Sequence, residues 1–169
     1  VLSVEKCYLP DQRFGGPYFV TGDASGAALI GTRTGDAILA VTQHMNTKNM
    51  QTDKFNSGSG LSDLYFFTNL VKALLKGTRE AGIGLGDIRL LITNHTLSDI
   101  WSVLIQLLRI PPERLYPGHL DEVSHLNNCD LLINYERVMD GDLLKQGDHY
   151  ALLSLGSGGV AACAICRKG

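Results

Sequence analysis

The feature that most constrains the fold of this chain is a short apolar strand followed directly by a helix. Residues 88–93, rich in Leu and Ile, predict a strand that is buried in a sheet. Ser98 and Asp99 then begin a helix that is expected to continue through Leu108 and to end before Pro111. A strand that leads into a helix is typical of α/β folds.

The rest of the chain predicts further elements of the same two kinds. Apolar side chains recur at helical spacing between Leu64 and Leu75, which predicts a helix that begins at Ser62 and ends at Gly82. Another helix is expected over residues 131–139. Strands are expected over residues 1–7, 37–43, 150–155 and 160–165, the second of them in a hairpin after the turn at Gly35. This order predicts an α/β fold with a mixed sheet and helices on its faces.

Composition excludes several classes of function. The 169 residues are 44% hydrophobic and 19% charged, which is typical of a globular protein with one ordinary core. With a net charge of -2 and scattered basic residues, no nucleic-acid partner is expected, and no apolar run approaches the roughly 20 residues of a membrane span. Four cysteines without framework spacing and the lack of a signal peptide predict a cytoplasmic protein.

The first candidate site is the turn after the strand 88–93, where Asn94 and His95 stand before the next helix. Reactive side chains of α/β enzymes often lie at such strand-to-helix turns. His95 could be a general base, with Asn94 as a hydrogen-bond partner. Alternatively, His95 only caps the start of the helix, and the sequence leaves both interpretations open.

The second candidate site is the polar stretch 124–130, directly before the helix at 131–139. Asp130 or Asn127 could orient a histidine from elsewhere in the fold. Alternatively, Asp130 only begins the helix, where a carboxylate suits the helix dipole. Residue types alone would also permit a zinc site from three residues of this region, but their spacing matches no known metal motif, so no metal is expected. These three are His119, His125 and Cys129.

The third candidate site is the glycine-rich turn 156–159, which contains Ser157. Glycines let backbone N–H groups approach a developing oxyanion, although they also serve a tight hairpin turn. The nearby Cys163 and Cys166 are three residues apart in an expected strand and should face opposite sides of it. They are interpreted as packing residues and not as a reactive pair.

Taken in order, these segments resemble the ketosynthase III-like (3-oxoacyl-ACP synthase III) family of the thiolase superfamily, in its carboxy-terminal part. The resemblance covers nearly the whole chain and rests on the order and spacing of four segments: Gly22–Ala27, Leu91–Leu97, Asp140–Asp148 and Leu155–Gly159. It implies a thiolase-like α/β fold, half of a two-fold repeated αβαβα architecture. Residues 1–45 would end the amino-terminal half, residues 46–60 would form a loop, and residues 61–169 would form the carboxy-terminal half.

The resemblance implies an acyltransferase that moves an acyl group from coenzyme A or acyl carrier protein through a cysteine thioester. His95 would act as base or hydrogen-bond donor, with Asp130 as its partner and Asn127 as the fallback. A backbone N–H near Ser157 would stabilise the oxyanion. The thioester is the substrate, and no bound cofactor is implied.

The sequence departs from the family pattern at two places. The nucleophilic cysteine of the family lies upstream of the segment that begins at Gly22, before the part covered by this chain. An ungapped match would put Asn94 on the family's histidine position instead of His95, and the sequence leaves both assignments open. The alternative function is therefore a catalytically inert subunit that supports an active partner. The expected partners are a missing amino-terminal portion or second chain with the cysteine, the acyl carrier, and a second copy in a dimer.

Overall fold

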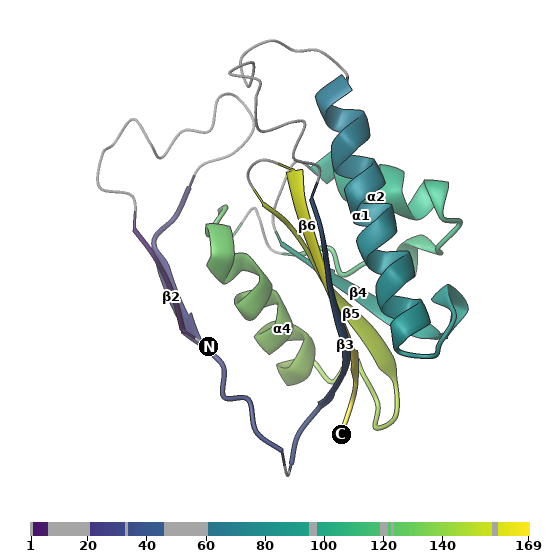
Figure 1. Cartoon of the computed structure of the whole chain (residues 1–169). Helices are drawn as coiled ribbons and strands as arrows, with labels where there is room; N and C mark the ends of the chain where they lie inside the picture. Colours follow the sequence, from purple (N-terminus) through teal and green to yellow (C-terminus); the bar gives the residue numbers. More distant parts are fainter. Residues whose placement is uncertain are drawn as a thin grey trace.

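The computed structural model describes residues 2–6, 21–32, 34–45, 61–94, 98–118, 122, 124–156 and 159–169 (Figure 1). The strands are β1 (Leu2–Glu5), β2 (Ala24–Ala27), β3 (Ala37–His44), β4 (Ile88–Thr93), β5 (His149–Gly156) and β6 (Val160–Arg167). The helices are α1 (Leu61–Glu80), α2 (Ser98–Leu107) and α4 (Asp130–Asp140), with short 3-10 turns at Leu85–Asp87, Pro112–Arg114 and Asn127–Cys129. The predicted helices and strands are confirmed to within about two residues at the ends that the structure describes.

A mixed sheet forms the centre of the fold. Its four strands stand in the order β3-β6-β5-β4. The strand β4 runs parallel to β5, whereas β6 is antiparallel to both β5 and β3. This arrangement confirms the mixed sheet predicted from the sequence.

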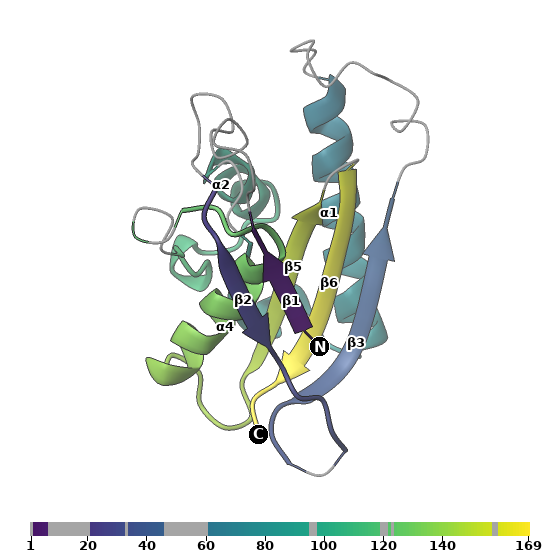
Figure 2. The same ribbon diagram turned by 90° about the vertical axis from the view of Figure 1, so that its left-hand side faces the viewer.

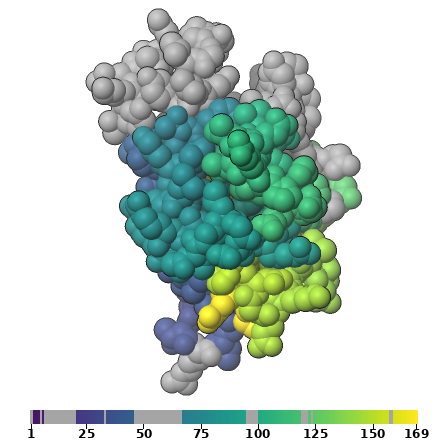
Figure 3. All heavy atoms as spheres, turned by 90° about the vertical axis from the view of Figure 1, so that its right-hand side faces the viewer, coloured from purple at the N-terminus to yellow at the C-terminus, as the bar shows by residue number. Residues whose placement is uncertain are grey.

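Helices cover both faces of this sheet (Figure 1). On one face, α1 and α2 pack on buried side chains such as Leu91, Leu153 and Ile165; Figure 3 views the molecule from this side. On the other face, α4 packs on a second set that includes Ile92, Tyr150 and Cys166. Because both faces are covered, the strand at 88–93 is almost continuously apolar. Within the described ranges, no helix is both long and apolar enough to cross a bilayer.

The helix α1 lies close against the sheet because one of its residues lacks a side chain. A Cβ atom on Gly77 would lie 3.2 Å from Cγ1 of Ile165 and 3.4 Å from Sγ of Cys163. Thr42 of β3 also donates a hydrogen bond from Oγ1 to the carbonyl of Ala73, over 2.7 Å. The helix ends as predicted near Gly82, which has a φ of +71°.

The strands β1 and β2 form a separate antiparallel pair, with α4 between them and the large sheet (Figures 1 and 2). Gly26 allows this close packing, since a Cβ atom there would lie 2.9 Å from Cδ1 of Leu132. The prediction of a hairpin around Gly35 was wrong. The short β2 already pairs with β1, and β3 crosses to the large sheet, where it pairs along most of its length with β6.

The predicted boundaries of the two thiolase-like halves and the loop between them, at residues 45 and 60, stay predictions. In the structure, β3 shares its sheet with the strands after residue 61, and β1 and β2 stand apart. The expected loop at 46–60 lies outside the described residues.

Asp36, just before β3, joins three parts of the chain at one end of the sheet. Its Oδ2 atom accepts hydrogen bonds from the hydroxyls of Tyr150, at 2.6 Å, and Tyr135, at 3.2 Å. Its Oδ1 atom accepts from Nζ of Lys168 and from the backbone N–H of Gly169, both at 3.1 Å. This carboxylate therefore ties the start of β5 and the end of β6 to α4.

Candidate active site at the ends of the strands

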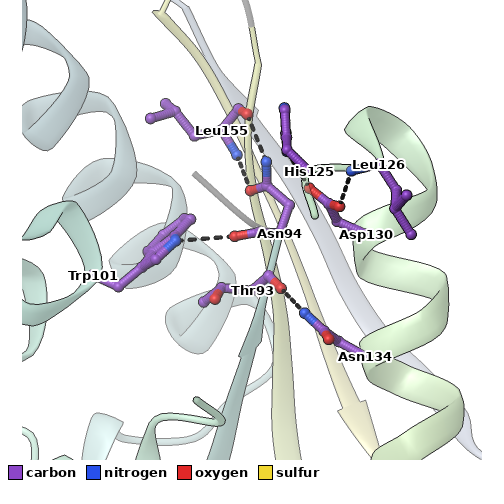
Figure 4. Close-up of polar contacts among 8 residues, drawn as sticks. All are labelled: Thr93, Asn94, Trp101, His125, Leu126, Asp130, Asn134 and Leu155. Atoms are coloured by element: carbon purple, nitrogen blue, oxygen red, sulfur yellow. Dashed lines mark hydrogen bonds and ion pairs between the residues drawn. The ribbon is translucent and has the colours of Figure 1, made fainter. Parts of the chain in front are cut away.

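The end of β4 is the first part of the candidate site, and its Asn94 is held by the neighbouring strand. The side chain of Asn94 is buried, with 5% of its surface exposed. Its Oδ1 atom accepts from the N–H of Leu155 at 2.9 Å, and its Nδ2 atom donates to the Leu155 carbonyl at 3.1 Å (Figure 4). The amide thus continues the β4–β5 ladder beyond the last strand residue.

The two flanking helices satisfy the last carbonyl groups of β4 (Figure 4). Trp101 of α2 donates from Nε1 to the Asn94 carbonyl at 3.0 Å, and Asn134 of α4 donates from Nδ2 to the Thr93 carbonyl at 2.8 Å. Buried carbonyls need such partners, since water cannot reach them. The backbone that leads to His95 is therefore fixed from both sides of the sheet.

A histidine–carboxylate pair lies at the start of α4. The Nδ1 atom of His125 is 2.7 Å from Oδ2 of Asp130, and Oδ1 of Asp130 accepts from the N–H of Leu126 at 2.6 Å. Asp130 has no exposed surface, and the His125 side chain is 13% exposed. A carboxylate at Nδ1 keeps the proton on that nitrogen, so that Nε2 is the basic atom of the ring. The sequence left two roles open for Asp130, and in the structure it begins the helix and also binds a histidine.

The backbone of His125 is held by the segment that begins at Gly22. The N–H of Gly22 donates to the His125 carbonyl at 2.9 Å, and Thr21 forms an isolated parallel bridge with His125. Ser124, directly before the histidine, has a φ of +63°. The amino-terminal part of the chain thus helps to place a side chain whose carboxylate partner lies on α4.

The structure places only some of the predicted site residues. Asn127 lies exposed in the 3-10 turn before α4, with a φ of +51°, and its carbonyl accepts the N–H of Asp130. His95 and Ser157 lie outside the described residues. The pairing of His95 with Asp130 or Asn127, and the role of Ser157, therefore stay predictions.

Sequence reasoning named His125 as a possible zinc ligand and paired Asp130 with His95, so the contact between His125 and Asp130 was missed. The signal was present, because this histidine stands five positions before an aspartate at a helix start. Among the residues that the structure describes, no three His, Cys, Asp or Glu side chains gather as a metal site would require.

The described cysteines lie in packed surroundings. Cys163 contacts the core under α1 and α2, and Cys166 contacts the core under α4, which confirms that they face opposite sides. Burial, with a smaller contribution from Cys166, raises the pKa of the Cys163 thiol to about 12. Burial is also the main cause that raises the pKa of Cys166, to about 11. The Sγ atom of Cys129 donates to the Ala24 carbonyl at 3.6 Å.

Residues 78–168 match the family described as 3-oxoacyl-[acyl-carrier-protein (ACP)] synthase III C terminal. The chain belongs to this synthase III family. The predicted resemblance to the carboxy-terminal part of this family, with its thiolase-like fold, is confirmed. A search of curated protein sequences gives no match.

Solved structures with the synthase III fold resemble this chain. ChlB3, described as an acyltransferase, has a TM-score of 0.78 and 20% identity over 99% of this chain and 57% of its own. The synthase III of Thermus thermophilus has a TM-score of 0.73 and 22% identity over 88% of this chain and 52% of its own. OleA of Xanthomonas campestris has a TM-score of 0.66 and 16% identity, over 78% and 37%. The chain spans little more than half the length of the first two structures.

Proposed function

We propose that this chain is the carboxy-terminal part of an acyltransferase in which His125 and Asp130 form the acid–base pair. The 2.7 Å contact between His125 and a wholly buried Asp130 carries the proposal. A carboxylate so placed orients the imidazole and stabilises the imidazolium that forms when Nε2 takes a proton. ChlB3, whose structure resembles this chain, is described as an acyltransferase, which supports the same class of reaction here.

The proposed reaction has two steps. A cysteine thiolate, supplied by polypeptide outside this chain, attacks the carbonyl of an acyl thioester of coenzyme A or acyl carrier protein. The carrier leaves as a thiolate, which takes a proton from water, and the acyl group stays on the cysteine. The acceptor then attacks this new thioester while His125 takes its proton, and the cysteine thiolate leaves.

Two further groups belong to the proposal. Backbone N–H groups of the turn 156–159, with Ser157 among them, would stabilise the oxyanion in each step. His95 would be a second histidine at the site, as base or hydrogen-bond donor. Asn94 is less suited to that role because both polar atoms of its amide already bind Leu155.

The partners follow from this chemistry. The acyl thioester is the substrate and no resident cofactor is needed. The remaining part of a synthase III-like protein would supply the nucleophile, and we include a dimer and a cytoplasmic location in the proposal. The alternative of a catalytically inert subunit has no support from the comparisons.

The test uses the full-length protein that contains this chain. The protein is mixed with acyl-coenzyme A or acyl carrier protein thioesters of increasing chain length, and intact-protein mass spectrometry detects the acyl-enzyme. Candidate acceptors, with hydroxyl, amine or carbanion nucleophiles, are then added to measure transfer. Formation of an acyl-enzyme that an acceptor discharges is the expected result.

His125→Ala is expected to lower the rate of transfer by at least about a hundredfold, as for a lost general base. His149→Gln is the matched control, because His149 lies at the opposite end of β5, and its transfer rate should stay unchanged. Absence of any acyl-enzyme, or equal transfer by His125→Ala and the parent protein, would contradict the proposal.

A further inference from the structure

Two buried asparagines hold the two ends of the glycine turn 156–159. Asn94, after β4, binds both backbone groups of Leu155, just before the turn. Asn69, on α1, donates from Nδ2 to the carbonyl of Gly159, the last turn residue, at 2.6 Å. Asn94 and Asn69 are 5% and 2% exposed. Amides from two different elements thus converge on one short turn.

Pairing of the strands alone does not require these contacts. The β5–β6 ladder closes with Gly156 opposite Val160, which already defines the hairpin. Burying an amide costs free energy unless its hydrogen bonds are made, so apolar side chains would serve simple packing better at these positions. The two amides tie Leu155 to the end of β4 and Gly159 to α1.

We propose that Asn69 and Asn94 are positioning residues for acyl transfer, because they fix Gly159 and Leu155, one at each end of the glycine turn. This inference rests on the proposed function, in which the turn stabilises the oxyanion. Oxyanion donors act only when they are already aimed at the place where the charge develops. A displacement of about 1 Å, even one caused far from the reacting atoms, can cost about a hundredfold in rate.

Asn94 and Asn69 make different contacts, so one of them is the better position for a selective substitution. Asn94 also carries the carbonyl that Trp101 binds and precedes His95, so its substitution would disturb several groups. Asn69 lies on α1 and donates a hydrogen bond to the carbonyl of Gly159. Asn69→Ala therefore removes the hydrogen bond to Gly159 and leaves His125 and Asp130 unchanged.

The experiment compares the full-length protein with its Asn69→Ala variant in the acyl-transfer assay. We expect kcat to fall about tenfold to a hundredfold, with KM for the acyl thioester changed less than about twofold. The midpoints of the pH profile of kcat/KM should stay in place, because the His125–Asp130 pair is intact. Asn69→Ser, whose shorter hydroxyl can still donate, should lose less and serves as the test if Asn69→Ala does not fold.

Thr42→Val is the matched control for a lost buried hydrogen bond. Thr42 donates to the Ala73 carbonyl, one turn further along α1, and this bond does not involve the turn. The control should lower Tm and keep the kcat of the parent protein. If the parent protein transfers acyl groups, either of two results would overturn the inference. One is an unchanged kcat in both Asn69→Ala and Asn69→Ser, and the other is a fall in kcat of Thr42→Val equal to that of Asn69→Ala. A parent protein without acyl transfer would instead overturn the proposed function, and this inference with it.

Discussion

The Nδ1 atom of His125 lies 2.7 Å from the Oδ2 atom of Asp130, which has no surface exposed to water. A buried carboxylate needs hydrogen bonds or a charged partner, because burial otherwise disfavours its ionised form. The N–H of Leu126 gives it a further partner at 2.6 Å. In the proposed function, this contact orients the ring of His125 for proton transfer.

Asp130→Asn should lower kcat for acyl transfer by about a hundredfold to ten-thousandfold in the full-length protein. The amide keeps the shape of the carboxylate but favours the wrong tautomer of His125 and cannot stabilise its charged form. Steady-state kinetics with an acyl thioester and an acceptor measures the change, after circular dichroism has verified the fold. A variant with the kcat of the parent protein would remove Asp130 from the mechanism.

His95→Ala tests the second histidine independently. The family resemblance predicts a loss in turnover of about a hundredfold or more if His95 acts as a general base. The measurement is the same kinetic assay, run beside His125→Ala. An unchanged turnover would leave the base function to His125 alone.

Asp36→Asn should destabilise the protein at neutral pH by about 1–3 kcal/mol, because it weakens hydrogen bonds to a partly buried charge. Burial alone would raise the pKa of Asp36, but hydrogen bonds from Tyr150, Gly169 and Lys168, with the charge of Lys168, together hold it below its ordinary value. The contribution of a carboxyl with a lowered pKa is present above its unfolded pKa of about 3.9 and is lost as pH falls through the folded value.

Thermal or urea unfolding between pH 7 and pH 3 measures this dependence. The difference in stability between the parent protein and Asp36→Asn should be constant near neutral pH and should shrink below about pH 4. A difference that grows on acidification would show that Asp36 is not held in its ionised form.

Cys163 and Cys166 should resist alkylation in the native protein. Their pKa values, raised mainly by burial to about 12 and about 11, leave very little thiolate at pH 8. Iodoacetamide treatment followed by peptide mass spectrometry should find both unmodified until denaturant is added. Rapid native labelling of either residue would mean that the sheet opens locally at β6.

Local patterns predicted most of the secondary structure. The strand at 88–93 could be recognised because both faces are covered, and apolar runs of that length suit a doubly buried strand. The pairing of β3 could not be predicted, since a turn at Gly35 is compatible with a hairpin and with a crossing to another sheet. The pairing of His125 with Asp130 could have been predicted from their spacing of five residues, whereas the bridge that places the His125 backbone beside Thr21, more than a hundred residues away in sequence, could not.

The Asp36 cluster and the Asn94 contacts lie at opposite ends of β5, which runs from His149 to Gly156. One end is held by a carboxylate and tyrosine hydroxyls, and the other by neutral amides. Acid should therefore loosen the first end before it affects the second. If the proposed function holds, changes made at the Asp36 end to improve heat tolerance should affect turnover little, whereas most substitutions at the Asn94 end should lower it.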